Sequence, residues 1–288
     1  EDGAVSRSAH PPASAVSECV ERALAEDLLP MGDLTAALLD EGVFGAARFV
    51  ARAAGVLAGS ACVEETYRQL GGEVTVAWRV GEGEAFGEGG VIAELSGPLA
   101  PLLSGERTAL NFLRHLSGVA SLTDRFVSVA RGRITVLDTR KTTPGLRALE
   151  KAAVRAGGGR NHRASLSDAV LIKDNHLGGI SIEEAVGRAK RMWPGRMVEV
   201  ECDRLDQVRS AVGAGATMVL LDNMSPDEVR ACVREVAGRC LVEVSGRVTL
   251  ETLDAYADTG ADYVSSGALT HSAPQIDIGL DLDTGIGG

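Results

Sequence analysis

Basic side chains are concentrated in one part of an acidic chain. The segment from Arg131 to Lys173 holds ten Lys or Arg residues and three Asp or Glu residues, although the 288-residue chain has a formal charge of −11. Guanidinium and ammonium groups bind carboxylate and phosphate oxygens through charge-assisted hydrogen bonds. A basic segment in an acidic protein therefore indicates a pocket for a small, highly anionic ligand.

An exposed helix face is the alternative interpretation for part of this cluster. Arg147, Lys151 and Arg155 recur every four residues, as the solvated side of a helix would require. That interpretation does not cover Arg140, Lys141 and Lys173, which lie at the ends of predicted strands.

Polar residues come directly after six short apolar runs in the second half of the chain. In parallel α/β folds the carboxyl ends of the strands meet at one rim, where ligands bind. One polar residue after a strand is usually a cap or loop residue, but candidates at all six ends favour a site. The residues are Asp138-Thr139-Arg140-Lys141, Lys173-Asp174-Asn175-His176, Glu201, Asp222-Asn223, Ser245-Gly246 and Ser266-Gly267-Ala268.

Two of these strand ends have the composition of phosphate-binding turns. Ser245-Gly246 and Ser266-Gly267-Ala268 are small enough for backbone N–H groups to approach a phosphate. Turns favour Gly for conformational reasons as well, so each turn alone is weak support. Glu201 and Asp222 could hold Mg²⁺ or ribose hydroxyl groups, or could pair with the basic cluster.

The alternation of short apolar runs with amphipathic stretches predicts parallel βα units. Strands are expected at 134–137, 169–172, 197–200, 217–221, 241–244 and 263–264. Helices are expected between them at 145–156, 182–192, 205–214, 226–236 and 250–257. Six strands are two fewer than a closed eight-stranded barrel needs, so an incomplete barrel or an open sheet is predicted. Earlier in the chain, helices are expected at 16–28 and 104–120.

Composition excludes several classes of protein. The negative charge argues against a general binder of nucleic acid or membrane surfaces. No apolar run approaches the roughly 20 residues that span a bilayer. Residues 1–17 are polar and do not have the pattern of a secretion signal, and the five cysteines include no C-x-x-C pair. A cytoplasmic protein with reduced thiols and no zinc site is expected.

Several motifs resemble one enzyme family, the type II quinolinate phosphoribosyltransferases. They are Glu106-Arg107-Thr108-Ala109-Leu110-Asn111, Asp138-Thr139-Arg140-Lys141-Thr142, Gly157-Gly158-Gly159-Arg160-Asn161-His162-Arg163, Leu171-Ile172-Lys173-Asp174-Asn175-His176 and Gly267-Ala268-Leu269-Thr270-His271-Ser272. The resemblance runs from about residue 16 to residue 282.

The resemblance implies an α/β protein with an N-terminal α/β sandwich domain and a C-terminal open, six-stranded α/β barrel. The expected division is a tail at 1–15, the sandwich at 16–118, the barrel at 119–274, and a segment at 275–288 that returns toward the N-terminal domain. The implied reaction joins quinolinate to phosphoribosyl pyrophosphate with Mg²⁺ and releases pyrophosphate and CO₂. A homodimer with shared active sites is also implied.

The resemblance also assigns roles to individual residues. Quinolinate would be held by Arg107 from the partner subunit and by Thr139, Arg140, Lys141, His162, Arg163 and Lys173. Lys141 would also act near the pyrophosphate and ribose, and Glu201 and Asp222 would hold the ribose hydroxyls directly or through Mg²⁺. Phosphate would be bound by Ser245, Gly246, Arg247, Ser266, Gly267 and Ala268, with His271 close by. The residues expected to take part in catalysis are Lys141, Lys173, Glu201 and Asp222.

Two positions depart from the family pattern. Arg247 stands where a smaller residue is usual, and Ser266 replaces a residue that is often apolar.

Two other functions remain open at this point. One is a related protein of the same fold that acts on another ligand, such as the molybdenum-linked members, and the other is a non-catalytic phosphate-binding regulator. The dense set of Arg residues favours quinolinate.

Overall fold

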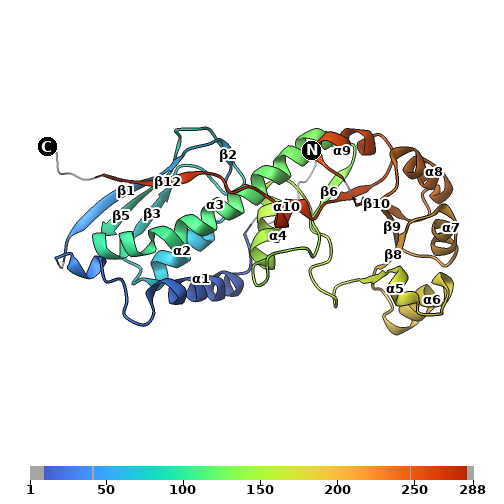
Figure 1. The fold of residues 1–288 in the computed structure, drawn as a ribbon, viewed down its shortest axis with the longest axis horizontal. Helices are drawn as coiled ribbons and strands as arrows, with labels where there is room; N and C mark the ends of the chain where they lie inside the picture. The colour runs from blue at the N-terminus through green and yellow to red at the C-terminus, as the bar shows by residue number, and fades with distance from the viewer. Residues whose placement is uncertain (1–9, 41, 247, 284–288) are drawn as a thin grey trace. The chain divides into compact units, whose positions relative to one another are not determined.

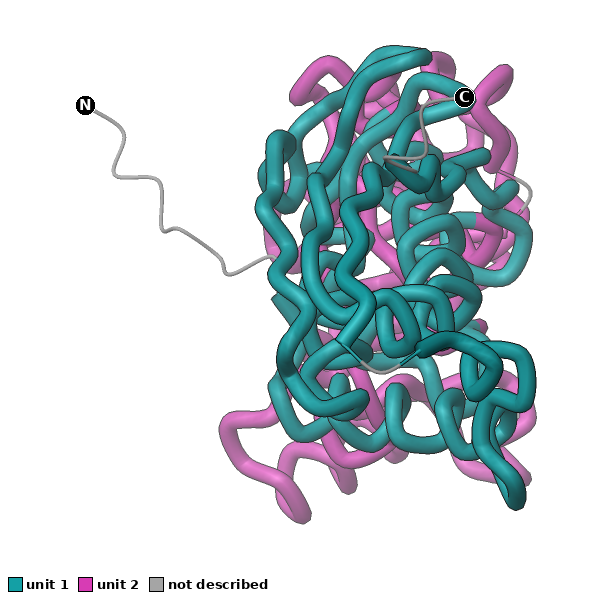
Figure 2. The backbone as a smooth tube through the Cα atoms, turned by 90° about the vertical axis from the view of Figure 1, so that its left-hand side faces the viewer, with its two compact units in different colours: residues 1–124, 142–158, 269–288 teal, residues 125–141, 159–268 magenta. Residues whose placement is uncertain are grey.

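The computed structural model describes residues 10–40, 42–246 and 248–283 (Figure 1). The chain forms two compact units whose segments interleave along the sequence, as the colours of Figure 2 show. The first unit comprises residues 1–124, 142–158 and 269–288, and the second comprises 125–141 and 159–268.

The first unit contains an antiparallel sheet of four strands in the order β12-β1-β5-β3. The strands are β1 (Phe44–Ala51), β3 (Thr75–Trp78), β5 (Val91–Pro98) and β12 (Ile278–Asp283). Two short strands, β2 (Gly55–Val56) and β4 (Ala85–Phe86), pair separately. Large apolar side chains such as Phe49, Ile92 and Leu95 are buried, and they form one core with Leu102 and Leu113. Sheet and helices are thereby held together by apolar burial.

The helices of this part of the chain are α1 (Ala13–Leu28), α2 (Ser60–Gln69), α3 (Leu99–Ala130) and α4 (Arg147–Ala156), with the short helices η1 (Ala36–Leu38) and α10 (Ala268–His271). Helix α3 extends beyond the predicted 104–120 at both ends, and Gly105 and Gly118 lie inside it without interrupting it. A Cβ atom at residue 118 would lie 2.2 Å from the carbonyl oxygen of Pro274. This glycine therefore permits a close backbone approach and does not end the helix.

The second unit is built on a parallel sheet of six strands in the order β6-β11-β10-β9-β8-β7. The strands are β6 (Thr135–Leu137), β7 (Val170–Ile172), β8 (Val198–Cys202), β9 (Met218–Asp222), β10 (Leu241–Ser245) and β11 (Tyr263–Ser265). Strands β6 and β7 are the two edges, so the barrel is open. The predicted α/β fold, a sandwich and an open six-stranded barrel, is confirmed.

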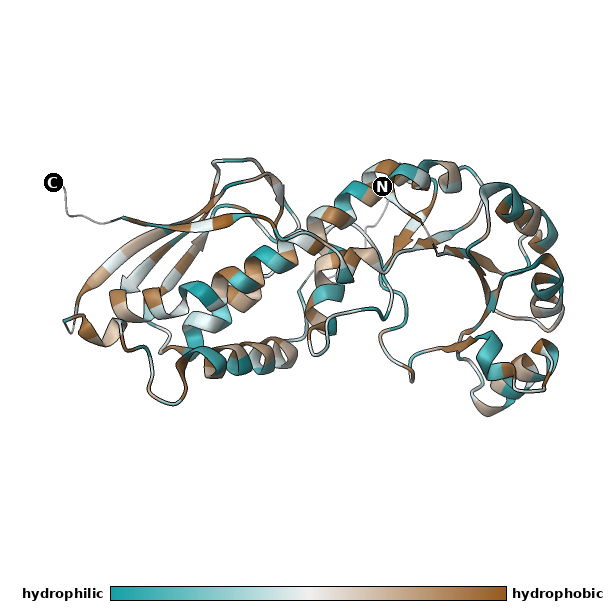
Figure 3. Ribbon diagram, in the orientation of Figure 1, coloured by the Kyte–Doolittle hydropathy of each residue, from teal (hydrophilic) through white to brown (hydrophobic). Residues whose placement is uncertain are grey.

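Amphipathic helices cover the outer side of this sheet (Figure 1). They are α5 (Asp174–Leu177), α6 (Ile182–Met192), α7 (Leu205–Gly213), α8 (Pro226–Val236) and α9 (Leu250–Ala257). Figure 3 shows mixed hydrophilic and hydrophobic residues along these helices and hydrophobic strands beneath them. Helix α8 begins at Pro226 because Ser225 and Glu228 form a reciprocal capping box. Among the described helices, none combines the length and the apolar character of a membrane span.

Candidate functional site

The candidate site lies at the carboxyl ends of the six parallel strands in the second unit. Because the strands run in the same direction, residues at their ends share one edge of the sheet. Glu201, Asp222 and Ser245 lie in the last two positions of β8, β9 and β10. Lys173 and Ser266 directly follow β7 and β11. The sequence interpretation that placed polar residues at these ends agrees with the structure.

A close ion pair joins two neighbouring strand ends. The Nζ atom of Lys173 lies 2.5 Å from Oε2 of Glu201, and both side chains are partly exposed. Strands β7 and β8 are adjacent and parallel, which brings the two groups together. The backbone N–H of Lys173 also donates to Nδ1 of His176 at the start of α5. This pair leaves one cation and one anion accessible at the same point of the rim.

Two guanidinium groups lie near each other at the rim. Burial lowers the pKa of Arg163, and the positive charge of Arg140 lowers this pKa further. Nη1 of Arg163 donates to the carbonyl oxygen of Ala169 at 3.0 Å. Nε of Arg140 is buried and has no hydrogen-bond acceptor among the described residues. Two neighbouring positive charges, one of them with an unsatisfied donor, make this part of the rim a candidate site for an anion.

The β9 and β10 ends are joined around a glycine turn. Asp222 and Ser245 are paired in register, and the backbone N–H of Asn223 donates to the carbonyl oxygen of Ser245 at 3.1 Å. Gly246 has φ +99°, and a Cβ atom there would lie 2.5 Å from Oδ1 of Asn223. Only glycine fits this turn without movement of its neighbours. On the neighbouring side, the N–H of Ser266 donates to the carbonyl oxygen of Leu137 at 3.2 Å.

Three carboxylates of the second unit are buried: Asp138, which the sequence placed at a strand end, and Glu199 and Glu243, which were not predicted from the sequence. Asp138 accepts from Nδ2 of Asn161 at 2.5 Å and from the backbone N–H of His162 at 2.9 Å. Nε2 of His162 lies 3.0 Å from Oε2 of Glu199 and 3.2 Å from Oε2 of Glu243. The segment 160–163 is therefore held from below by acidic side chains.

A signal for two of these residues was present in the sequence. Glu199 and Glu243 interrupt the buried apolar runs of β8 and β10, where both side chains are almost completely buried. A carboxylate in such a run requires a nearby partner, because burial of an unpaired charge is very unfavourable. Alternation along β8 also places Glu199 on the same face as Glu201.

The structure does not place every predicted residue at this rim. Arg107 lies on α3 in the first unit, and His271 ends α10 among residues that also belong to that unit. Thr139 directly precedes Arg140, and its Oγ1 accepts from the N–H of Lys141 at 3.0 Å. Gly267 and Ala268 follow Ser266 within the second unit. Arg247 lies outside the described residues.

The alternative interpretation of Arg147, Lys151 and Arg155 as one fully exposed helix face does not hold for all three residues. Lys151 is buried, with 4% of its surface exposed. Nε of Arg147 donates to Oγ1 of Thr142, and Arg155 donates to the carbonyl oxygen of His10. Lys151 is therefore packed inside the first unit, whereas Arg147 and Arg155 are partly exposed and make hydrogen bonds within that unit.

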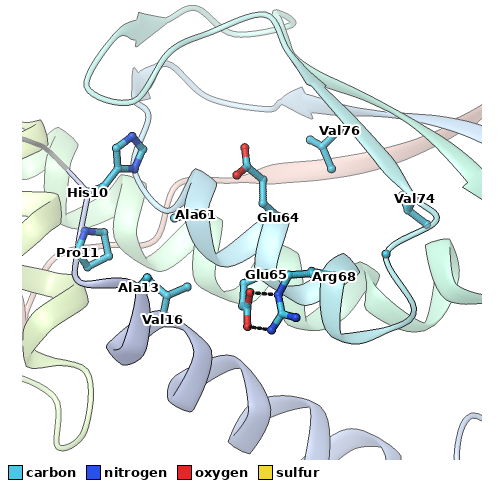
Figure 4. A pocket seen from close by; sticks show the side chains of 11 residues that line it. His10, Pro11, Ala13, Val16, Ala61, Glu64, Glu65, Arg68, Val74 and Val76 are labelled. Carbon is cyan, nitrogen blue, oxygen red and sulfur yellow. Dashed lines mark hydrogen bonds and ion pairs between the residues drawn. The ribbon is translucent and has the colours of Figure 1, made fainter.

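A separate cavity of about 640 Å³ lies in the first unit (Figure 4). Its acidic side chains are Glu64 and Glu65, and Glu65 pairs with Arg68 through two hydrogen bonds. Nε1 of Trp78 donates to Oε1 of Glu64 at 2.8 Å. An acidic lining does not suit an anionic ligand, and none of the candidate site residues contributes to it.

An open parallel barrel with a cationic rim and paired glycine turns defines an α/β protein that binds anionic ligands. Residues 33–117 match the family model of the quinolinate phosphoribosyl transferase N-terminal domain, and residues 119–281 match that of the C-terminal domain. The chain belongs to the quinolinate phosphoribosyl transferase family.

Individual relatives cover almost the whole chain. A probable nicotinate-nucleotide pyrophosphorylase (carboxylating) of Bacillus subtilis is 44% identical over 87% of this chain and 88% of its own. The nicotinate-nucleotide pyrophosphorylase (carboxylating) of Mycobacterium leprae is 39% identical, over 93% of this chain and 97% of its own. The structure of the nicotinate-nucleotide pyrophosphorylase of Francisella tularensis superposes with a TM-score of 0.91 at 37% identity, covering 96% of this chain and 99% of that one.

Proposed function

We propose that this protein is a decarboxylating quinolinate phosphoribosyltransferase of NAD biosynthesis. It transfers the phosphoribosyl group of phosphoribosyl pyrophosphate to quinolinate and forms nicotinate mononucleotide, pyrophosphate and CO₂. Relatives with this name are similar to the chain over nearly its full length. The observation in the structure that carries the proposal is the rim itself, where the adjacent cations Arg140 and Arg163 share a sheet edge with Lys173, Glu201 and Asp222.

The cations of the rim bind the dicarboxylate substrate. The planar guanidinium groups of Arg140 and Arg163 each can bind a carboxylate through two parallel hydrogen bonds. Lys173 adds a third positive charge once its pair with Glu201 rearranges. Thr139 and Lys141 follow β6 on the same side and complete this part of the pocket.

The carboxylates and glycine turns bind phosphoribosyl pyrophosphate. Glu201 and Asp222 hold the ribose hydroxyls, and the turns at Ser245-Gly246 and Ser266-Gly267-Ala268 present backbone N–H groups to the 5′-phosphate. Both carboxylates are only partly buried and lie on adjacent parallel strands, so their oxygens fit the ligand preference of Mg²⁺. When bound, Mg²⁺ would offset the charge of the pyrophosphate leaving group.

The reaction then needs charge stabilisation and orientation from the protein. The ring nitrogen of quinolinate bonds to C1 of the ribose as the C1–pyrophosphate bond breaks. Lys141 stabilises the departing pyrophosphate, and the nearby carboxylates stabilise the cationic sugar. The ring nitrogen is now positively charged, so it stabilises the electron pair left on the adjacent carbon when CO₂ departs. A proton then takes the place of the carboxylate on that carbon.

The test is release of labelled CO₂ from carboxyl-labelled quinolinate by the purified protein with phosphoribosyl pyrophosphate and Mg²⁺. We expect stoichiometric release of CO₂ and pyrophosphate, and no release when phosphoribosyl pyrophosphate is omitted. A non-catalytic phosphate-binding regulator would release neither product. A family member with another substrate would release pyrophosphate only with that other acceptor.

We also propose a homodimer in the cytoplasm. Apolar side chains are unusually exposed in the segment that follows α1 in the first unit, where Leu38 has 83% and Met31 75% of its surface exposed. Leu29, Leu34 and Phe44 in the same segment are also exposed. Exposed apolar residues grouped in this way are typical of a protein interface. A second copy of the chain is the partner that fits active sites shared between subunits.

Complementation between two inactive variants tests whether Arg107 acts in the partner's site. When chains carrying Arg107→Ala and Arg140→Ala are mixed, a heterodimer has one site with neither change. We expect about a quarter of the wild-type activity in the randomly re-associated mixture, where half the dimers are mixed and each has one intact site, and about half in the purified heterodimers. The measurement is CO₂ release by heterodimers purified with two different tags. If verified heterodimers remain as inactive as the parent variants, Arg107 acts within its own chain.

A further inference from the structure

Both ring nitrogens of His162 are engaged by the protein itself. Nε2 lies 3.0 Å from Oε2 of Glu199 and 3.2 Å from Oε2 of Glu243. The backbone N–H of Arg163 donates to Nδ1 at 2.8 Å. The side chain of His162 has 8% of its surface exposed, and both glutamates are essentially fully buried. This geometry differs from that of a histidine that presents a ring nitrogen to a ligand.

The contact from Arg163 defines the protonation of the ring. An N–H donor requires a lone pair on Nδ1, so Nδ1 carries no proton in this arrangement. A neutral imidazole then carries its proton on Nε2, where Oε2 of Glu199 accepts it and Oε2 of Glu243 lies 3.2 Å away. The buried glutamates and the backbone of residue 163 therefore select the same tautomer from opposite sides of the ring.

We propose that His162 is a positioning residue rather than a direct ligand of quinolinate: Glu199 and Glu243 fix its Nε2–H tautomer, and Nδ1 in turn holds the backbone of Arg163 so that the guanidinium meets the substrate. The assignment rests on the proposed function for the identity of the substrate. It adds two further positioning residues, Glu199 and Glu243, to the site.

A metal site is the competing interpretation of the same cluster. The donor atoms of His162, Glu199 and Glu243 lie within 4.8 Å of one another, which is close enough to surround a cation. A metal-bound Nε2 would need its lone pair, and the ring proton would then move to Nδ1. A proton on Nδ1 would point at the N–H of Arg163 at a separation of 2.8 Å. The hydrogen-bonded triad satisfies this contact and the metal site does not.

The raised pKa of His162 favours a protonated ring and so opposes the neutral tautomer, and the contact at Nδ1 is the observation that decides between the two states. Burial lowers the pKa of His162, but the hydrogen bonds and charges of the two glutamates outweigh burial and raise this pKa to about 10. A fully protonated ring would again place a donor opposite the N–H of Arg163. The hydrogen-bond geometry therefore decides the state of Nδ1, and burial raises the pKa of Glu199, which favours an additional proton of the cluster on the glutamates.

The position of Arg163 depends on this chain of contacts from several directions. Asp138 accepts the backbone N–H of His162 at 2.9 Å, so the residue before Arg163 is held at its backbone as well as at its ring. Burial and the charge of Arg140 disfavour the charged guanidinium, whereas the carboxylate of Glu199 favours it. Without the contacts of His162 with Glu199, Glu243 and Asp138, Arg163 would move away from Arg140 and lose its alignment with the substrate.

Nitrogen-15 NMR of the histidine rings tests the assignment without reference to activity. In the free protein at neutral pH we expect His162 to show a protonated Nε2 and an unprotonated Nδ1, and to keep this pattern when quinolinate is saturating. Loss of the signals in a His162→Gln variant identifies them among the five histidines of the chain. A protonated Nδ1 in the free protein, or a change of tautomer on quinolinate binding, would overturn the proposal.

Matched substitutions at Glu199 test the positioning role kinetically. Glu199→Gln keeps an acceptor for Nε2–H and is expected to leave the KM for quinolinate within about twofold, whereas Glu199→Leu removes the acceptor and should raise it about tenfold. The KM for phosphoribosyl pyrophosphate should stay within about twofold in both. Adding Glu199→Leu to His162→Gln should change the KM for quinolinate by less than about twofold, because the glutamate acts through His162.

The outcomes separate this proposal from the proposed function. Equal losses in Glu199→Gln and Glu199→Leu, or fully additive effects of Glu199→Leu and His162→Gln, would show that Glu199 does not act by positioning His162. If the protein does not turn over quinolinate at all, the proposed function fails. The NMR spectrum of the free protein would still report the tautomer of His162 in that case.

Discussion

Replacing Arg140 with Ala is expected to lower kcat/KM for quinolinate by at least about a hundredfold. Nε of Arg140 is buried with no acceptor among the described residues, and the like charge of Arg163 lies near it. A dicarboxylate both satisfies these donors and relieves the repulsion between the two cations. Removing one member of a buried charged pair leaves the other unpaired, which costs roughly 3–5 kcal/mol. A hundredfold loss corresponds to about 2.7 kcal/mol and lies just below this range.

Two further substitutions make the Arg140 prediction specific. Arg140→Lys should recover only part of the lost activity, because an ammonium group lacks the planar pair of donors. Arg209→Ala is the matched control, since Arg209 forms an exposed ion pair with Glu235 on the outer helices and should keep near-normal activity. Steady-state kinetics with quinolinate compare the variants. Near-normal turnover by Arg140→Ala would show that this cation does not bind the substrate.

Nicotinate is expected to react at least about a hundredfold less efficiently than quinolinate in the wild-type protein. Quinolinate has two adjacent carboxylates and nicotinate has one, so nicotinate leaves at least one of Arg140, Arg163 and Lys173 without its anionic partner. An unpaired cation in a desolvated pocket destabilises the complex by roughly 3 kcal/mol or more. The preference for quinolinate over nicotinate therefore has two sources. One is the set of contacts that quinolinate makes, and the other is the free-energy cost of a cation left without a carboxylate in the nicotinate complex.

The measurement is kcat/KM for both acids under the same concentrations of phosphoribosyl pyrophosphate and Mg²⁺. In Arg140→Ala the ratio between the acids should fall toward unity, because the cation that distinguishes them is absent. A constant ratio in this variant would assign the discrimination to other residues. Comparable efficiency of the wild-type protein on both acids would contradict the interpretation of the rim as a dicarboxylate site.

Much of the second unit could be predicted from local patterns. Helices α6 and α8 were predicted with the bounds observed, and the six strands were each predicted to within a few residues. Their signals are local: apolar residues recur at helical spacing, and serine residues cap the first turns. The strands are mostly continuous runs of Val, Ile and Leu, a pattern that is typical of parallel strands buried on both faces. Helix α3 was predicted too short at both ends, at 104–120 rather than Leu99–Ala130.

The residues at the strand ends were also predictable, because the order of strands and helices along the chain determines which residues lie at the rim. Once strands and helices alternate, every strand end lies on one rim, and this places Lys173, Glu201 and Asp222 together without knowledge of their contacts. The sequence motifs then indicated the quinolinate phosphoribosyl transferase family, to which the chain belongs.

The sequence by itself determined the fold class, the family and the polar rim of the barrel, because these depend on local periodicity and on which residues end each strand. Only the tertiary structure showed that Lys173 pairs with Glu201 and that Glu199 and Glu243 meet the same nitrogen of His162. Those contacts join residues far apart in the chain. They depend on strand order, side-chain direction and burial, which a local pattern does not contain.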